Sequence, residues 1–169
     1  MKASKLKESF ETEFGEAIEG IRIEETKAGI ADKSNYELWI ETEKDYLVDM
    51  VEHLDSFQYP HLTVISGVDV GESIKLIYHL SVGYGELYGE VMVNIEFLVD
   101  KNDLTVPSLT GLIPGAETSE REKTEFLGVE FEGIPNPSHL FLPDDMDVHP
   151  WRKDEEELDD YVKKLDKQP

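Results

Sequence analysis

The chain has 169 residues and a formal charge of −22, because 38 Asp and Glu outnumber 16 Lys and Arg. Nucleic acids require a basic binding surface, and anionic lipid surfaces attract clustered Lys and Arg. The composition therefore argues against nucleic acid as a partner and against direct contact with a membrane. Cysteine is absent, which excludes disulfides, thiolate nucleophiles and thiolate ligands for zinc or iron–sulfur clusters.

The apolar residues predict one folded domain. They make up 39% of the chain and fall in periodic runs, and a chain of this length can bury about 70% of its unfolded surface. The N-terminus lacks the apolar segment of a signal peptide, and no run approaches about 18 apolar residues, so we expect a cytoplasmic protein that reaches a membrane only through a partner. Few Asn and Gln, together with 32% charged residues, favour a heat-adapted source.

The first third of the chain alternates between helical and strand patterns. A short helix is expected over residues 4–14, then two half-buried strands around residues 21–23 and 36–40, with a turn at residues 32–35 between them. Residues 42–45, Thr-Glu-Lys-Asp, resemble a capping box at the start of a second helix. The apolar residues of that helix recur at a spacing that buries one face: Leu47, Met50, Val51, Leu54 and Phe57.

After Pro60 the pattern changes to the twofold period of β-strands. Three strands are predicted, over residues 62–68, 74–82 and 91–99. A short turn at residues 83–86 makes the last two antiparallel neighbours, and His79 is expected on the less buried face of its strand, opposite Tyr78. Helices and a mostly antiparallel sheet in separate runs predict an α+β domain, with helices packed on the sheet, over residues 1–133.

Seven of the eight prolines lie at or after Pro107, where long regular elements should give way to punctuated chain. A helical segment is predicted from Pro107 to about Gly111 or Pro114. A second helix is predicted from a capping box at residues 119–122 to Gly128. A stub of strand at residues 129–131 follows it.

The C-terminal part divides into an extended segment and a helix. Residues 134–154 show neither period, so we expect an extended, proline-rich arm, and residues 155–169 are expected to form a short acidic helix. The arm has five large apolar side chains: Leu140, Phe141, Leu142, Met146 and Trp151. Full burial of each is worth about 1.5–3 kcal/mol, so the arm packs either on the chain's own sheet or along another protein. In the second case Trp151 and Arg152 are the expected anchors.

Candidate catalytic groups are few. His139, Asp144, Asp145 and His149 could in principle hold zinc or iron, but their spacing matches no defined motif and prolines interrupt it. We favour bonds from these groups to backbone or partner atoms, and a free-standing metal-dependent hydrolase remains the alternative. The sequence has no nucleophile elbow, phosphate-binding loop or dinucleotide fingerprint. We therefore expect no catalytic residue, cofactor or metal.

The acidic helix around Arg121 has a simple interpretation. Consecutive helical side chains point about 100° apart, so Glu120, Arg121 and Glu122 cannot form one cluster. Arg121 is expected to pair with Glu125 one turn later, as a surface ion pair worth about 0.3–0.5 kcal/mol.

Five motifs in a fixed order over about 50 residues resemble the C-type subunit family of respiratory complex I. They also resemble its counterpart in archaeal membrane-bound [NiFe] hydrogenase and sulfur-reducing complexes. The motifs are Pro107-Ser108, Glu120-Arg121-Glu122, Gly128-Val129-Glu130-Phe131-Glu132-Gly133, Leu142-Pro143-Asp144-Asp145 and His149-Pro150-Trp151-Arg152-Lys153-Asp154. Departures from the family pattern at Thr118, Thr124-Glu125, Met146 and Glu155-Glu156 favour the hydrogenase-type branch, in which ferredoxin supplies the electrons.

The resemblance implies a structural subunit without cofactors, on the cytoplasmic side of a membrane-bound redox complex. Its implied partners are the large [NiFe]-hydrogenase-like subunit, which is the D-type subunit of complex I, and the subunit with the proximal iron–sulfur cluster. It would hold these two in register, which electron transfer and ion translocation require. A subunit of the NADH–quinone enzyme proper and an acidic adaptor unrelated to bioenergetics remain alternatives.

The resemblance also implies where the partner binds. Arg121, Arg152 and Lys153 would donate charge-assisted hydrogen bonds to the partner. The full set of expected partner-binding residues is Glu120, Arg121, Glu122, Leu140, Phe141, Leu142, Pro143, Asp144, Asp145, His149, Pro150, Trp151, Arg152, Lys153 and Asp154.

Overall fold

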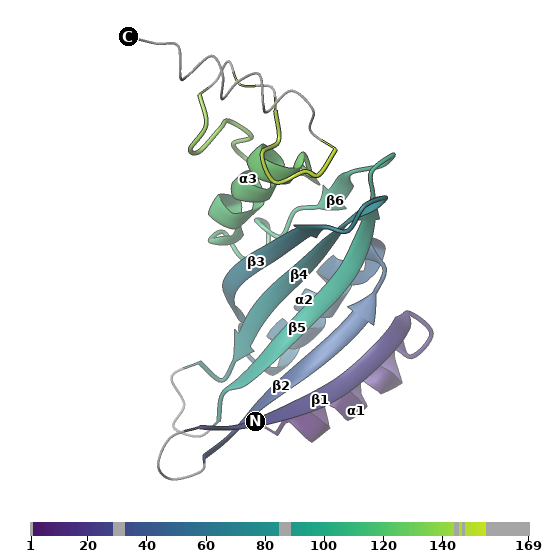
Figure 1. The fold of residues 1–169 in the computed structure, drawn as a ribbon. Coiled ribbons are helices and arrows are strands. Elements are labelled where there is room, and N and C mark those ends of the chain that lie inside the picture. The colour runs from purple at the N-terminus through teal and green to yellow at the C-terminus, as the bar shows by residue number, and fades with distance from the viewer. Residues whose placement is uncertain (1, 29–32, 85–88, 144–145, 147, 155–169) are drawn as a thin grey trace.

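The computed structural model describes residues 2–28, 33–84, 89–143, 146 and 148–154 (Figure 1). The helices are α1 (Ala3–Phe14), α2 (Leu47–Phe57) and α3 (Ala116–Leu127), and a 3-10 helix, η1 (Lys44–Tyr46), precedes α2. The strands are β1 (Ile18–Ala28), β2 (Lys33–Thr42), β3 (His61–Asp69), β4 (Ser73–Val82), β5 (Val91–Asp100), β6 (Thr105–Pro107) and β7 (Glu130–Glu132). The predicted acidic helix at residues 155–169 lies outside the described residues.

The five long strands form one mixed sheet in the order β1-β2-β5-β4-β3. Every neighbouring pair is antiparallel except β2 and β5, which run parallel with Tyr36 opposite Val91. A parallel pair needs a crossover, and here α2, β3 and β4 supply it. The α+β class and the mostly antiparallel sheet are confirmed, including the predicted antiparallel pairing of β4 with β5.

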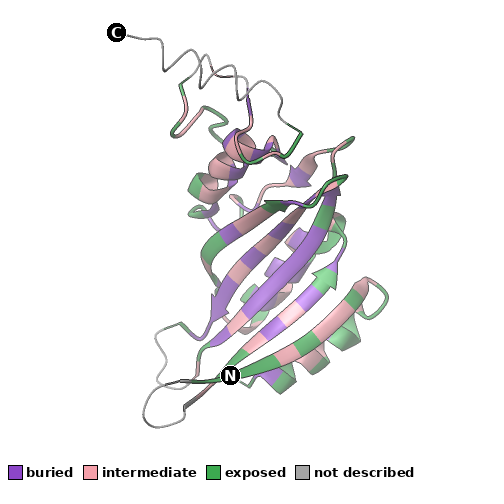
Figure 2. Cartoon of the chain, in the orientation of Figure 1, coloured by how far each residue is buried: buried purple, intermediate pink, exposed green. Residues whose placement is uncertain are grey.

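The core lies between the sheet and the helices. Alternate residues of β4 and β5 are fully or almost fully buried, and they form the purple centre of the sheet in Figure 2. Helices α1 and α2 lie behind the sheet in Figure 1, and the predicted apolar face of α2 is buried except at Phe57, which is half-buried. Helix α3 packs on the edge strand β3 at Gly67. A Cβ atom at Gly67 would come within 2.5 Å of Leu127 Cδ1, so the bare glycine allows this close approach.

The opposite face of the sheet carries polar side chains that bond one another. His79 lies there, as predicted, with Nδ1 2.7 Å from Asn94 Oδ1 and Nε2 3.0 Å from Ser66 Oγ. The guanidinium of Arg22 stacks 4.9 Å from the ring centre of Trp39. These contacts stabilise a sheet face that the described helices leave uncovered.

Two local predictions in the first half are wrong. Residues 33–35 continue strand β2 instead of forming a turn, because they pair with β1. The capping box at residues 42–45 does not form: the Thr42 hydroxyl donates to the carbonyl of Ala17, and Glu43 caps η1 without a side-chain hydrogen bond. In both cases strand pairing and a long-range bond override the local signal.

Two further predictions fail after Pro107. That residue belongs to β6, and turns follow it up to Gly115 instead of a helix. Helix α3 begins at Ala116, one turn before the predicted box, so Ser119 does not cap it. The parallel pairing of β6 with β7 fixes Pro107 opposite Glu132 and thereby removes it from any helix.

The pairing of β6 with β7 brings two of the sequence motifs together. The backbone N–H of Ser108 donates to the carbonyl of Glu132 at 3.0 Å. Helix α3 ends at Gly128, whose φ of +76° reverses the chain into β7, as the predicted stop required. This small sheet therefore fixes both ends of α3.

Candidate partner-binding site on helix α3 and the proline-rich arm

Glu120 anchors the start of the site from inside the protein. Its side chain is fully buried on α3, and its two carboxylate oxygens accept hydrogen bonds from the Ser108 hydroxyl at 2.6 Å and the Leu109 N–H at 2.7 Å. Burial raises the pKa of Glu120, against the opposing effect of these two donors. Glu120 thus ties the Pro-Ser motif to α3 and does not face a partner.

Glu125 holds the first half of the proline-rich arm. Its carboxylate is buried and accepts from three successive backbone N–H groups, those of Leu140 at 3.2 Å, Phe141 at 3.0 Å and Leu142. Hydrogen bonds to an ionised acceptor are about twice as strong as neutral ones. The predicted ion pair between Arg121 and Glu125 is wrong, because the arm's amides occupy this carboxylate.

Arg121 binds the same segment of the arm through that segment's backbone carbonyls. Its guanidinium donates to the carbonyls of Ser138 at 2.9 Å and His139 at 2.8 Å, and it lies 4.0 Å from the carboxylate of Glu117. Arg121 and Glu125 lie one helical turn apart on α3. Between them they engage the carbonyls and the amides of one short stretch of the arm.

The second half of the arm returns to the C-terminal end of α3. His149 Nδ1 lies 3.0 Å from the carbonyl oxygen of Glu125, and the Trp151 N–H donates to the carbonyl of Phe126 at 2.9 Å. The Trp151 ring stacks on Phe126 with centroids 4.4 Å apart. A Cβ atom at Gly128 would lie 2.9 Å from His149, so this glycine also makes room for the returning arm.

Charged residues fix the end of the arm to the β3–β4 hairpin. The Asp69 carboxylate accepts from the Lys153 N–H and from Lys101 Nζ, both at 2.7 Å. Lys101 also pairs with Asp154 at 3.1 Å, and Arg152 donates to Asp154 at 2.8 and 3.0 Å. The bonds from Arg152 and then Lys101 hold the pKa of Asp154 well below its usual range.

Asp69 is the buried member of this cluster. Burial alone would raise its pKa, but the bonds from Lys101, the Lys153 N–H and the Gly71 N–H outweigh burial and lower it. The carboxylate is therefore stabilised in its charged form. The sequence offered no signal for Asp69 or Lys101, because neither lies near the arm along the chain.

The apolar residues of the arm divide into sheltered and exposed groups. Val148 is buried, and Leu140, Leu142 and Met146 are half-buried. Phe141 is 66% exposed and Trp151 45% exposed. The arm thus packs in part on its own chain and leaves two aromatic rings exposed. Packing along another protein stays a prediction.

The expected partner-binding residues therefore have different roles. Arg121 and Arg152 make bonds within the chain, and Glu122 pairs with Lys123, which lies 4.9 Å above the Trp151 ring. Pro143 supplies a carbonyl to His139 Nδ1 at 3.0 Å, and Pro150 is half-buried. The side chain of Lys153 is exposed. Asp144 and Asp145 lie outside the described residues.

Phe126 and Glu125 are site residues that the motifs did not single out. Glu125 was expected only as an ion-pair partner of Arg121, and the sequence gave no sign that it binds the arm. Phe126 lies two residues before Gly128, where the next motif begins, and gave no signal.

The hydrolase alternative finds no metal centre in the described part of the chain. His139 and His149 both place Nδ1 against carbonyl oxygens, and no group of three or more His, Cys, Asp or Glu able to hold a metal occurs among the described residues. Their neighbours Asp144 and Asp145 are not described.

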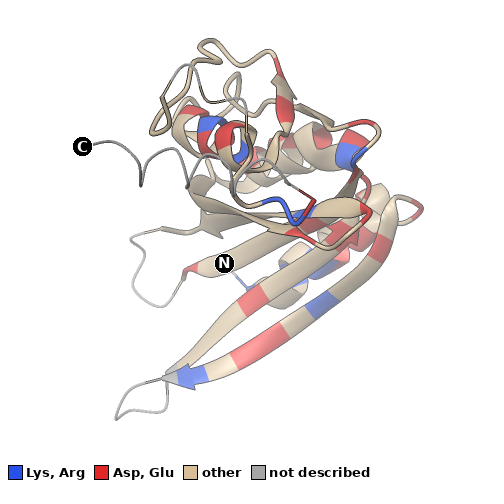
Figure 3. Cartoon of the chain, turned by 45° about the horizontal axis from the view of Figure 1, so that its top comes forward, with Lys and Arg blue, Asp and Glu red and all other residues tan. Residues whose placement is uncertain are grey.

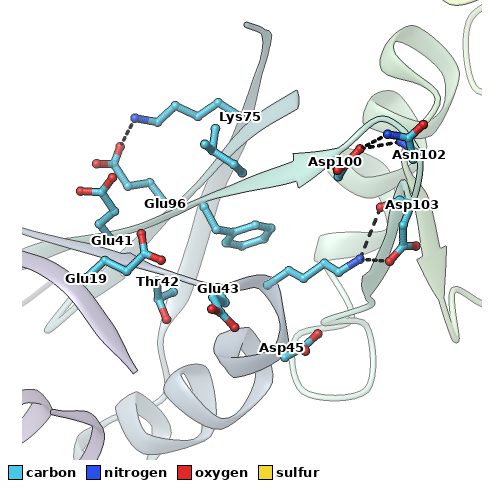
Figure 4. A pocket seen from close by; sticks show the side chains of 13 residues that line it. Glu19, Glu41, Thr42, Glu43, Asp45, Lys75, Glu96, Asp100, Asn102 and Asp103 are labelled. Atoms are coloured by element: carbon cyan, nitrogen blue, oxygen red, sulfur yellow. Dashed lines mark hydrogen bonds and ion pairs between the residues drawn. The ribbon is translucent and has the colours of Figure 1, made fainter. Parts of the chain in front are cut away.

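A cavity of about 550 Å³ lies at the ends of β2 and β5, away from α3 (Figure 4). Seven carboxylates line it, those of Glu19, Glu41, Glu43, Asp45, Glu96, Asp100 and Asp103. Lys44 pairs with Asp103 at 2.6 Å, and Lys75 pairs with Glu96 at 2.8 Å. This concentration of negative charge disfavours phosphates and other anionic substrates.

Two solved structures have a similar fold. A chain of the membrane-bound sulfane sulfur reductase, an archaeal respiratory membrane complex, aligns with a TM-score of 0.67 and 27% identity, over 95% of this chain and 91% of its own. The trypsin-resistant fragment of Nqo5 aligns with a TM-score of 0.60 and 21% identity, over 80% of this chain and 99% of the fragment, and shows the shared fold.

Sequence comparison gives the family. Residues 40–161 match the model of the respiratory-chain NADH dehydrogenase 30 Kd subunit, and the chain belongs to this family. The J subunit of NAD(P)H-quinone oxidoreductase from Prochlorococcus marinus (strain NATL1A) is 34% identical over 120 residues, which cover 68% of this chain and 69% of that protein. The C-type counterpart in the NADH-quinone oxidoreductase of Moorella thermoacetica is 36% identical over 107 residues, or 62% and 70% of the two chains. None of the described helices is long and apolar enough to cross a membrane.

Proposed function

We propose that the chain is a non-catalytic, structural subunit in the hydrophilic arm of a membrane-bound, complex I-like redox complex. The proposed complex is of the ferredoxin-linked [NiFe] hydrogenase or sulfur-reducing type. The chain holds the large [NiFe]-hydrogenase-like subunit and the proximal iron–sulfur subunit in register on the cytoplasmic side of the membrane. Family membership supports the complex, and the similarity to the sulfane sulfur reductase chain over 95% of this sequence supports the branch.

The observation that carries this proposal is that the motif residues form bonds within the chain. Glu120 bonds the Pro-Ser motif, Arg121 and His149 together with Glu125 hold the proline-rich arm on α3, and Asp154 pairs with Lys101. Residues arranged in this way set a shape and leave no free acid–base pair for chemistry among the described residues of the site. The shape that they set presents Phe141 and Trp151 to a neighbour.

The proposed mechanism is indirect. Electron transfer from a cluster to a reaction site in another subunit depends on a fixed separation between them. A rigid subunit that contacts both partners fixes that separation without taking part in the chemistry. The small sheet of β6 and β7, the helix α3 and the bound arm provide such a rigid unit.

Purification through a tag on this chain, in mild detergent, tests the proposal. Mass spectrometry should find the large and iron–sulfur subunits with it. The double substitution Trp151→Ala with Arg152→Ala should lower the yield of the complex, because it removes an exposed anchor and one support of the arm's end. Circular dichroism of the variant chain alone should show the wild-type sheet, and normal assembly of the variant would count against a role for the arm.

Three other candidates give different results in the same purification. The identity of this chain to the two quinone oxidoreductase subunits described above favours an NADH–quinone complex, which would bring quinone-type subunits. A metal-dependent hydrolase would purify alone, with stoichiometric zinc or iron on metal analysis. An acidic adaptor would bring unrelated proteins.

A further inference from the structure

Two of the three cations expected to reach a partner, Arg121 and Arg152, are already engaged within the chain, whereas the side chain of Lys153 is exposed. Arg121 donates to two arm carbonyls, Arg152 to Asp154, and Lys123 to Glu122. Lys101 is shared by two carboxylates. Redirecting any of these cations to a partner would leave its present acceptor without a charge-assisted bond, and for buried groups that loss is costly.

The remaining charge of this face is negative. Among the described residues from 116 to 154 there are seven Asp and Glu and four Lys and Arg. In Figure 3 the blue segments of α3 lie among red ones. Glu120 and Glu125 are buried on backbone amides, whereas Glu117 and Glu122 are partly exposed on α3. A partner with a negative surface would be repelled here, and one with Lys and Arg would be attracted.

The exposed aromatic rings are held rigidly in the middle of this charge. Phe126 contacts both of them, with ring centres 6.1 Å from Phe141 and 4.4 Å from Trp151. The backbone N–H of Phe141 is bound by Glu125, and that of Trp151 by the Phe126 carbonyl. Since these backbone positions are fixed before docking, binding loses little conformational entropy.

We infer that this face docks, by its aromatic rings and its carboxylates, into an apolar cleft that Lys and Arg side chains border on the partner. The inference rests on the proposed function and names the chemistry of the partner at that site. Phe141, Phe126 and Trp151 form the apolar centre. Glu117 and Glu122 lie at its edge, and although they pair with Arg121 and Lys123, each is partly exposed and has a second carboxylate oxygen that can accept from a partner cation. The positive charge at this interface thus lies mainly on the partner, whereas the sequence analysis expected it on this chain.

A charge-reversal experiment tests the inference in the native complex. The tagged full-length chain is expressed in its own cells with Glu117→Lys and Glu122→Lys, and the accompanying proteins are quantified by mass spectrometry. The matched control reverses two exposed acids of α1, Glu8→Lys and Glu11→Lys, and so changes the net charge equally. We expect recovery of the partner subunits to fall about tenfold or more for the α3 variant and to stay at the wild-type level for the control.

A second pair of variants tests the aromatic centre. Phe141→Ser with Trp151→Ser should lower recovery about tenfold or more, whereas Tyr59→Ser with Tyr84→Ser, which are exposed at 57% and 66% elsewhere, should not. Thermal unfolding of each purified chain identifies variants that have lost their fold. For such a variant, Glu117→Gln with Glu122→Gln replaces the charge reversal and should give a smaller loss in the same direction.

The outcomes separate the inference from the proposed function. Equal recovery by the α3 and α1 charge variants, with wild type retrieving the redox subunits, overturns the inference and leaves the proposed function standing. So does equal recovery by the two aromatic variants. A wild-type chain that retrieves no redox subunit overturns the proposed function and this inference with it.

Discussion

At the scale of single residues, two buried carboxylates of α3 each bind a segment of the chain that lies outside the helix. Glu120 and Glu125 are both buried, and each accepts from backbone N–H groups of a segment outside the helix. In a proline-rich stretch, neither a helix nor a sheet supplies acceptors for the backbone N–H groups, so side chains or water must do so. The two carboxylates therefore supply the hydrogen-bond acceptors for the loop and for the arm that a neighbouring strand supplies in a sheet.

The substitution Glu125→Gln tests this role. An amide keeps one acceptor oxygen but places N–H donors against the donors of residues 140–142, so we expect the free energy of unfolding to fall by about 1.5–3 kcal/mol. Hydrogen exchange should accelerate at these three amides more than in the sheet. Glu117→Gln, on the same helix but partly exposed and only 4.0 Å from an Arg121 that has other acceptors, is the control and should change stability by less than about 0.5 kcal/mol. Unchanged protection of the arm amides in the Glu125 variant would contradict the assignment.

The pKa of Asp69 predicts a pH dependence with a definite sign. Its folded-state pKa is lowered from the unfolded value of 3.8, so its contribution to stability is fully present above that value. As pH falls through 3.8 towards the lower folded pKa, the carboxylate protonates and the contribution is lost. The stability difference between wild type and Asp69→Asn should therefore be largest near neutral pH and should shrink below pH 3.8.

Denaturant titrations across this pH range measure that difference. Asp55→Asn, at an exposed position of α2, is the control and should follow the wild type at every pH. A difference that stays constant down to the acid transition would mean that Asp69 acts through packing and not through its charge.

At the scale of elements, Gly128 is where α3, β7 and the arm meet. Its φ of +76° is costly for any other residue, and a Cβ atom there would lie 2.9 Å from His149. Gly128→Ala should lower the free energy of unfolding by about 1–3 kcal/mol and should loosen the second half of the arm. Gly115→Ala is the matched control, because Gly115 has a φ of −66° and nothing within 4 Å of a Cβ atom. This control should be neutral or stabilising by about 0.4–1 kcal/mol.

Much of the fold could be predicted because the local pattern of apolar residues indicates most helices and strands. The alternation in β4 and β5 and the helical spacing in α2 each reflect burial on one face, which neighbouring residues specify. Two of the failures share one cause. Thr42 donates to Ala17, 25 residues away, and Pro107 pairs in a parallel ladder with β7, so a partner distant in sequence decided the local structure.

The motifs selected α3 and the arm as the candidate site, and the choice of this site stays a prediction. The bonding within it could not be predicted, because no local pattern indicates that Arg121 donates to carbonyls 17 and 18 residues along the chain. Asp69 lies 84 residues from the Lys153 N–H that it binds, and no local pattern could join the two.

At the scale of the whole molecule, the domain and the arm differ in what supports them. The sheet, α1 and α2 share a continuous apolar core, whereas the arm is held mainly by hydrogen bonds and ion pairs and by the ring of Phe126. We expect the apolar core to suffice without the arm, since removing the arm should return Glu125 and Asp69 to water instead of leaving them buried and unpaired.

A chain that ends at Gly133 should therefore fold by itself. We expect one cooperative unfolding transition, with a Tm about 5–10 °C below that of the full chain, because the burial of Val148 and the stacking of Trp151 are lost. In cells, the tagged short chain should retrieve little or none of the redox subunits that the full chain retrieves. A short chain without a cooperative transition would move the domain boundary past Gly133. A short chain that folds and still retrieves every redox subunit would show that the docking surface lies on the sheet and not on the arm. The uncovered sheet face around Trp39 would then be the first candidate.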